Sequence, residues 1–288
     1  MLDVYLLITN NCNLKCGHCY GNYGPGGKTM TKPQLEAVLR HLPKNTARIT
    51  LSGGEATTQM EALRFALGFI QEQRETLYPQ AKVVLETNGT WVRNQESAYQ
   101  ILHELSELGL AELQISSIDD FHRAAGVNTK LLGLNGLSPL SLALFQLVET
   151  AHQHLFVVLS GGSHCVPLGR GRDLPANFHR HAYCSLERNL RDFPAYGNVT
   201  IGPDGGVFPC CWQVTPEMGS AFEYPVAEIL RRSLATPLFR TLVNFGPSAV
   251  AANLNLTRDN PRTPSEYDNY CHICFLMFDQ ARKLGLIE

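Results

Sequence analysis

The sequence predicts an α/β fold, because apolar, β-rich segments alternate with amphipathic segments over the first 160 residues. The alternation is typical of parallel βα units. Polar or glycine-rich sequence follows nearly every expected strand, at the face where the chemistry of a βα barrel gathers. The expected strands are 3–9, 47–52, 82–86, 112–117 and 154–159, and the expected helices are 31–42, 58–75, 94–108 and 138–152.

Local signals support these elements in order along the chain. Residues 3–9 are short, apolar and β-rich, and a cysteine-containing loop follows them directly. Thr31 is a helix cap, with Pro33 in the first turn of the helix that it opens. The second strand ends in Gly-Gly-Glu at 53–55, the third in Thr-Asn-Gly at 87–89, and the fourth in a serine pair at 116–117.

The pattern changes after residue 165. Residues 165–191 are rich in His, Arg, Pro and Gly and show no clear period. Segments 198–201 and 206–208, joined by Gly-Pro-Asp-Gly, predict a β-hairpin. Short helices are expected at 225–232 and 235–244, then a polar loop at 253–270 and a last amphipathic helix at 271–286. We therefore expect a core domain over 1–165, extending to about 180, and a smaller domain over 181–288.

The composition of the chain limits the kinds of binding partner that we expect. The formal net charge of −2 offers neither a basic face for nucleic acid nor a polybasic patch for a membrane surface. The N-terminus lacks the positive region of a signal peptide, and the longest apolar stretch, Leu137 to Val148, is too short to span a bilayer. We expect a cytoplasmic protein with no nucleic-acid or membrane partner.

Nine cysteines, an odd number, fall mostly in tight groups, which in a cytosolic protein indicates metal binding or catalysis. Cys12, Cys16 and Cys19 are spaced CxxxCxxC and supply three thiolates from one loop. Thiolates are the ligands of iron–sulfur clusters, and three of them leave one iron of a cubane open to a ligand that is not protein. Structural zinc sites prefer four closed ligands, so the spacing favours iron–sulfur over zinc.

These motifs in this order resemble the radical S-adenosylmethionine (radical SAM) superfamily over residues 3–160. The resemblance implies a partial (β/α)6 barrel of the TIM type. It implies that Cys12, Cys16 and Cys19 hold a [4Fe–4S] cluster whose open iron binds S-adenosylmethionine. It further implies that the cosubstrate is cleaved to a 5′-deoxyadenosyl radical that abstracts a substrate hydrogen.

The resemblance also assigns roles to strand-end residues. His18 takes the position where the family usually has an aromatic residue against adenine, and a solvated loop residue is the alternative. Gly53 and Gly54 would let the backbone approach the methionyl amine, and Glu55 would orient that loop. Contacts to ribose or carboxylate are expected from Asn88, Ser116 and Ser117.

Two charged segments follow later strands. Arg170, in Val-Pro-Leu-Gly-Arg-Gly-Arg, suits a clamp for a carboxylate or phosphate of a bound cofactor, and an exposed loop is the alternative. Asp119 and His122 follow the fourth strand and either reach the active site or form an ordinary charged loop.

The C-terminal third resembles the twitch domain, a shortened form of the SPASM domain, in which four cysteines hold an auxiliary [4Fe–4S] cluster. The expected ligands are Cys184, Cys210, Cys271 and Cys274, with Cys211 as a substitute for Cys210. A structural zinc site with the same thiolates is the alternative. Cys165 and Cys211 are then left as buried apolar side chains or as a catalytic hydrogen donor.

The resemblance implies an oxidoreductase or epimerase acting on a small polar metabolite, with an electron donor of the flavodoxin or ferredoxin type. The first strand starts at residue 3, without the N-terminal leader-recognition domain of some peptide-modifying relatives, which favours a small molecule. One alternative is a maturase of a ribosomal peptide that forms a crosslink or inverts a stereocentre. Another is a non-catalytic cysteine–metal protein.

Overall fold

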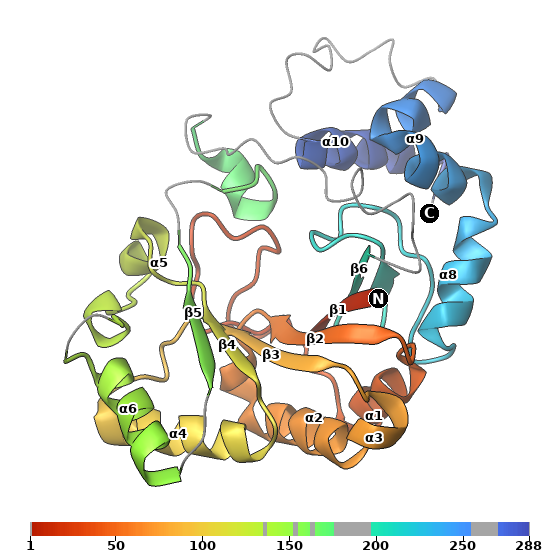
Figure 1. The fold of residues 1–288 in the computed structure, drawn as a ribbon. Coiled ribbons are helices and arrows are strands. Elements are labelled where there is room, and N and C mark those ends of the chain that lie inside the picture. The colour runs from red at the N-terminus through yellow and green to blue at the C-terminus, as the bar shows by residue number, and fades with distance from the viewer. Residues whose placement is uncertain are drawn as a thin grey trace.

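A computed structural model describes residues 2–134, 137–151, 155–161, 165–175, 197–254 and 270–287. The chain forms a mixed α/β fold around one seven-stranded sheet of order β5-β4-β3-β2-β1-β6-β7 (Figure 1). All neighbouring strands are parallel except β6 and β7. The α/β fold class expected from the sequence is confirmed.

The strands and helices lie close to the segments expected from the sequence. The strands are β1 (Leu2–Thr9), β2 (Thr46–Gly53), β3 (Lys82–Thr87), β4 (Glu112–Ile115), β5 (Phe156–Leu159), β6 (Gly197–Ile201) and β7 (Val207–Phe208). The helices are α1 (Lys32–His41), α2 (Met60–Glu72), α3 (Arg74–Leu77), α4 (Gln95–Glu107), α5 (Asp120–Ala124), α6 (Pro139–Ala151), α8 (Val226–Leu234), α9 (Pro237–Asn253) and α10 (Tyr270–Lys283). Short 3₁₀ turns occupy η1 (Ala56–Gln59), η2 (Thr129–Leu131) and η3 (Gly169–Asp173).

Three details differ from the sequence expectation. The single helix expected over 58–75 is divided into η1, α2 and α3. The helix expected to end at residue 244 continues as α9 to Asn253, through a kink at Gly246, whose φ of 79° is open to glycine, and Pro247. Helix α5 was not expected; Asp119 caps it by accepting the His122 N–H at 2.8 Å. Most of the loop expected at 253–270 lies outside the described residues.

Local capping explains where two of the predicted helices begin. Thr31 is the N-cap of α1, and its N–H donates to Gln34 Oε1 at 2.9 Å. Asn94 caps α4 by accepting the Ser97 N–H at 2.9 Å. These short-range contacts involve residues three apart, so the sequence is sufficient to indicate them.

The hairpin of β6 and β7 belongs to the main sheet. The sequence placed this hairpin in a C-terminal extension, but β6 pairs in parallel with β1, with Thr200 beside Tyr5. The pairing covers the backbone of β1, which would otherwise be an open edge. Cys211, which follows β7, lines the same cavity as the cysteines of the first loop.

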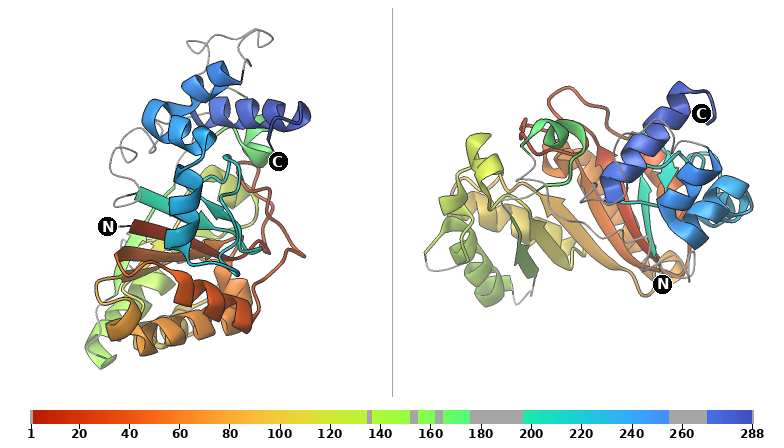
Figure 2. Two further views of the ribbon diagram at one scale, coloured as in Figure 1. Left: turned by 90° about the vertical axis from the view of Figure 1, so that its right-hand side faces the viewer. Right: turned by 90° about the horizontal axis from the view of Figure 1, so that it is seen from above.

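The two sides of the sheet have different surroundings. Helices α1, α2, α4 and α6 pack against one face. The loop after β1, α9 and α10 lie on the opposite side of the sheet (Figures 1 and 2). The main core lies between the sheet and the first group of helices. A second apolar cluster, around α9 and α10, contains Cys210, Cys271 and Cys274. None of the described helices is both long enough and apolar enough to cross a bilayer.

Candidate active site

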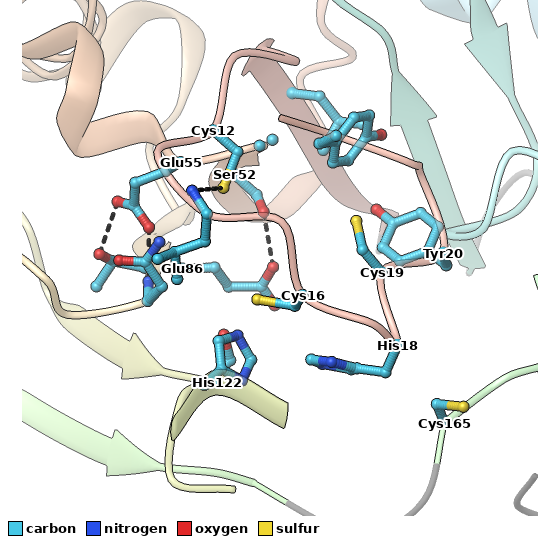
Figure 3. A pocket seen from close by; sticks show the side chains of 18 of the residues that line it. Cys12, Cys16, His18, Cys19, Tyr20, Ser52, Glu55, Glu86, His122 and Cys165 are labelled. Carbon is cyan, nitrogen blue, oxygen red and sulfur yellow. Dashed lines mark hydrogen bonds between the residues drawn. The ribbon is translucent and has the colours of Figure 1, made fainter. Parts of the chain in front are cut away.

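A cavity of about 390 Å³ lies at the carboxyl ends of the strands (Figure 3). Its walls come from β1, the loop after β1, the ends of β2, β3 and β4, the 165–170 segment and the end of the hairpin. Twelve residues that the sequence singled out line it: Cys12, Cys16, His18, Cys19, Gly53, Gly54, Glu55, Asn88, Ser116, Cys165, Arg170 and Cys211. Ser117, Cys210, Cys271 and Cys274 are not among its lining residues, and Cys184 lies outside the described residues.

The three cysteines of the first loop all face this cavity. The Leu14 N–H donates to Cys12 Sγ at 3.4 Å, and the Cys19 N–H closes a turn onto the Cys16 carbonyl at 3.2 Å. Burial, followed by the charges of Cys12 and Cys19, raises the pKa of Cys16 to about 12. Such a set of thiols ionises together only when cations sit among them. The donor set therefore fits an iron–sulfur cluster.

Arg170 holds this loop from the other side of the cavity. Its guanidinium donates from Nε to the Cys16 carbonyl at 2.8 Å, from Nη2 to the Tyr23 carbonyl at 2.7 Å and from Nη1 to Asn22 Oδ1 at 3.2 Å. Its backbone N–H donates to the Cys19 carbonyl at 3.0 Å. The sequence predicted a ligand clamp here. The contacts in the structure instead place most of the guanidinium's hydrogen bonds on the cysteine loop.

The two glycines after β2 are required by the protein's own backbone. A Cβ at Gly53, whose φ is 139°, would lie 2.0 Å from the Thr9 carbonyl oxygen. A Cβ at Gly54 would lie 2.4 Å from the Asn11 carbonyl oxygen. The close approach lets the Gly54 N–H donate to Thr9 and the Glu55 N–H donate to Asn11, at 2.8 and 2.9 Å. The sequence argued for these glycines from ligand approach, and it missed this packing of β2 on the cysteine loop.

Gly53→Ala is expected to lower the free energy of unfolding by about 2–4 kcal/mol, because the substitution combines a positive φ with a backbone clash. Urea denaturation followed by circular dichroism measures the change. Gly68→Ala is the matched control, since Gly68 lies within α2 with nothing within 4 Å of an added Cβ. That variant should be neutral or slightly more stable. Equal stability of the two variants would contradict the packing argument.

Glu55 ties the end of β2 to the end of β3. It is 2% exposed and accepts hydrogen bonds from Thr87 Oγ1 at 2.7 Å, the Asn88 N–H at 2.6 Å and the Thr57 N–H at 3.1 Å. Burial raises the pKa of Glu55, and the hydrogen bond from Asn88 opposes that rise. These contacts join the loop after β2 to the end of β3; the orienting role that the sequence predicts for Glu55 stays a prediction.

The polar residues after β3 and β4 divide into two groups. Asn88 Nδ2 donates to Asn13 Oδ1 at 2.9 Å, so this side chain joins β3 to the cysteine loop. Ser116 is exposed to the cavity. Ser117 is fully buried and is not among the residues lining the cavity, and its hydroxyl has no hydrogen-bond partner among the described residues. Only one of the two serines is thus placed to contact a ligand, because adjacent extended residues point in opposite directions.

His18 presents an aromatic ring to the cavity. It stacks on Phe121 at a ring-centroid distance of 4.7 Å and meets His122 edge-on at 4.8 Å. Burial, followed by the charge of His122, lowers the pKa of His18 to about 4, so the ring is neutral at pH 7. Its Nδ1 is buried without a partner among the described residues.

His122 also lines the cavity, and its Nδ1 lies 2.8 Å from Asp119 Oδ2. Ligand atoms of His18, Asp119 and His122 lie within 4.8 Å of one another, a spacing compatible with a metal ion. Both carboxylate oxygens of Asp119 are, however, already engaged by His122. This arrangement describes a helix cap and an oriented histidine better than a metal centre.

The adjacent cysteines of the hairpin end differ in their surroundings. Cys211 lines the cavity, whereas Cys210 is buried in the second core with Cys271 and Cys274. Cys210 Sγ accepts the Trp212 N–H at 3.3 Å. A hydrogen bond between the two cysteines lowers the pKa of Cys210 and raises that of Cys211. The structure therefore separates Cys211, which lines the cavity, from a buried group of three cysteines.

Several cavity residues were missed by sequence reasoning or passed over as packing. Inward-facing side chains of the strands supply Tyr5, Ser52 and Glu86, and Tyr20 and Trp212 form an aromatic wall with ring centroids 4.7 Å apart. The available signal was a lone glutamate, Glu86, within the otherwise apolar run of β3. A period of two places such a residue on one face, but does not say that the face lines a cavity.

One comparison matches a family model to part of the chain. Residues 6–130 match the model of the radical SAM superfamily. The crystal structure of BtrN in complex with AdoMet and 2-DOIA is similar in fold, with a TM-score of 0.54 and 17% identity over 93% of this chain and 96% of that chain. A comparison with curated protein sequences gives no match.

Two further solved structures are more distant. Streptococcus suis SuiB bound to S-adenosylmethionine has a TM-score of 0.41 and 14% identity over 84% of this chain and 68% of that chain. The anSMEcpe protein with bound AdoMet and Cp18Cys peptide has a TM-score of 0.46 and 13% identity over 99% of this chain and 98% of that chain.

Proposed function

Because residues 6–130 match the model of the radical SAM superfamily, we propose that the protein belongs to this superfamily, cleaves S-adenosylmethionine reductively and abstracts a substrate hydrogen. The observation that carries the proposal is the convergence of Cys12, Cys16 and Cys19 on one cavity that Gly53 and Gly54 also line. A [4Fe–4S] cluster bound there would supply the electron that breaks a carbon–sulfur bond of S-adenosylmethionine and yields the 5′-deoxyadenosyl radical.

The chain's own residues hold the cysteine loop and bind and orient S-adenosylmethionine. Arg170 and the Leu14 N–H hold the cysteine loop in place. His18, neutral at pH 7, offers its ring to the adenine, which suits stacking without a charge penalty. Asn88 and Ser116 stand at strand ends where ribose and carboxylate groups would lie. Glu55 keeps the β2 loop against β3.

The same proposal includes an auxiliary [4Fe–4S] cluster held by Cys210, Cys271 and Cys274, with Cys184 as the fourth ligand. Support comes from the burial of the first three in one cluster and from the Trp212 N–H on Cys210 Sγ, a contact that stabilises a ligating thiolate. Cys210 is favoured over Cys211 as ligand. Cys211 and Cys165 line the main cavity and are left for hydrogen donation to a substrate radical.

We assign the substrate to small polar metabolites, and the outcome to oxidation or epimerisation. The similar fold of BtrN, whose crystal structure contains AdoMet and 2-DOIA, supports a second small ligand beside S-adenosylmethionine. The polar groups of the cavity, among them Ser52, Glu86 and His122, suit such a ligand. An electron donor of the flavodoxin or ferredoxin type completes the proposed system.

The proposed cleavage of S-adenosylmethionine is tested by anaerobic reconstitution, followed by reduction with dithionite in the presence of S-adenosylmethionine. We expect 5′-deoxyadenosine as a product. Its absence, or zinc in place of iron, would leave only a non-catalytic metal protein. Product formation that requires a precursor peptide would instead favour a peptide maturase.

Replacing Cys210 with alanine is expected to halve the iron content, from about eight to about four atoms per chain, with 5′-deoxyadenosine formation retained. Iron and sulfide analysis measures the change. Cys211→Ala is the matched control, because it removes the neighbouring thiol and should retain both clusters. Loss of iron in Cys211→Ala but not in Cys210→Ala would reverse the assignment.

A further inference from the structure

Glu86 places a carboxylate inside the cavity, among the inward-facing side chains of the strands. It lies on β3 in register between Ser52 of β2, by extension of their pairing, and Gln114 of β4. Its Oε2 accepts a hydrogen bond from Ser52 Oγ at 2.8 Å, as Figure 3 shows. Like Ser52, it belongs to the cavity wall. A buried carboxylate is costly unless a cation or several donors face it.

The nearby cations are committed to a different carboxylate. Arg48 Nη2 and Lys82 Nζ both bind Glu112, at 2.6 Å each, and Arg48 Nε donates to Thr50. Burial raises the pKa of Glu86, and the hydrogen bond from Ser52 and then the charge of Arg48 oppose that rise. Among the described residues, though, no cation lies within ion-pair distance of Glu86. Glu86 therefore faces the cavity with no direct counterion from the part of the chain that the structure describes.

Aromatic residues complete the surroundings of Glu86. Tyr5, Tyr20, Tyr23 and Trp212 line the same cavity. The Tyr5 hydroxyl lies close enough to Glu86 for their charges to interact: burial, followed by the charge of Glu86, raises the pKa of Tyr5 to about 12. The pKa of Tyr20 is also raised, by burial first, then by the charge of Tyr23 and by that of Glu86. Aromatic faces beside a carboxylate are the usual recognition chemistry for an organic ammonium group.

We infer that Glu86, with the aromatic side chains of Tyr5 and Tyr20, forms a subsite for an ammonium group of the substrate. The ammonium would supply the counterion that none of the described residues gives to Glu86, and the rings favour a cation over a neutral hydroxyl of the same size. This inference rests on the proposed function, since it narrows the small polar metabolite to one that carries a protonated amine.

Equilibrium dialysis under anaerobic conditions tests the subsite with two probes of matched shape, cyclohexylamine and cyclohexanol. The reconstituted protein is saturated with S-adenosylmethionine, so that the cosubstrate occupies its own site. We expect the wild type to bind cyclohexylamine at least about tenfold more tightly than cyclohexanol. Glu86→Gln, which keeps a partner for Ser52, should remove this preference. Glu86→Asp should retain part of it.

Glu61→Gln is the matched control: Glu61 pairs with Lys32 on the surface, and its loss should not change either affinity. Equal affinity of the two probes in the wild type would overturn the inference without any variant, even if Glu86→Gln failed to fold. An unchanged preference in a folded Glu86→Gln would overturn it as well. The formation of 5′-deoxyadenosine in the same preparation is a separate readout. A protein that cleaves S-adenosylmethionine but does not prefer the amine contradicts only this inference.

Discussion

Replacing Cys16 with alanine is expected to abolish 5′-deoxyadenosine formation and to lower the iron content from about eight to about four atoms per chain. The loop contributes three thiols to one cavity, and Cys16 is buried among them at 7% exposure. In this variant only two thiolates would remain to hold the first cluster. The loop contains no other cysteine that could replace the lost ligand. Iron analysis, electron paramagnetic resonance of the reduced protein and chromatography of the nucleoside product measure the outcome. Alanine at Cys12 or Cys19 should act in the same way.

The matched control is Cys165→Ala. Cys165 is a buried cysteine that lines the same cavity but lies outside the CxxxCxxC loop. This variant should retain the full iron content. A Cys16→Ala protein that still held both clusters would contradict the ligand assignment, whatever its catalytic activity.

Arg170→Lys is expected to accelerate iron loss from the first cluster by roughly 10- to 100-fold. The reason is the loss of the guanidinium fork, which bonds the Cys16 and Tyr23 carbonyls and Asn22. Lysine keeps the charge but not the geometry, and two lost hydrogen bonds at about 1 kcal/mol each correspond to this range. The rate of iron transfer to a chelator measures the effect, and it is read without catalysis.

Arg172→Lys provides the comparison, because Arg172 belongs to the same segment and its guanidinium lies over the Phe275 ring at 5.6 Å. It should lose iron at the wild-type rate. Similar rates for Arg170→Lys and Arg172→Lys would show that Arg170 does not hold the loop. A shift in the reduction potential of the first cluster in Arg170→Lys alone would support the positioning role further.

The elements with short-range signals were predictable. The hydrophobic period and the Thr31 cap depend on residues within a few positions, so strands β1 to β5 and helices α1, α2, α4 and α6 were expected nearly where they lie. Helix α5 was not expected. The division of the expected second helix into η1, α2 and α3 was missed, and so was the second helical segment of α9 beyond the kink at Gly246 and Pro247.

The candidate site was predictable only in part. Strand-end motifs led to Cys12, Gly53, Glu55 and others that share the cavity. Glu86 and Tyr5 were not found, because the position of a residue within a strand reveals which face it lies on but not what that face encloses. Arg170 was predicted as a site residue, but with a ligand as its partner. Its hydrogen bonds to the cysteine loop were missed because they join residues about 150 positions apart.

By itself, the sequence determined the α/β class and predicted cluster-binding chemistry at the first loop. Both depend on local features, the alternation of apolar segments and the spacing of three thiols. Only the tertiary structure decided that β6 lies beside β1, which brings Cys211 and Trp212 to the first cavity and places Cys210 in the second core. It also decided that the cations beneath Glu86 are bound to Glu112. The physical reason is that strand pairing and charge pairing are settled by competition among residues far apart in the chain, which no local pattern records.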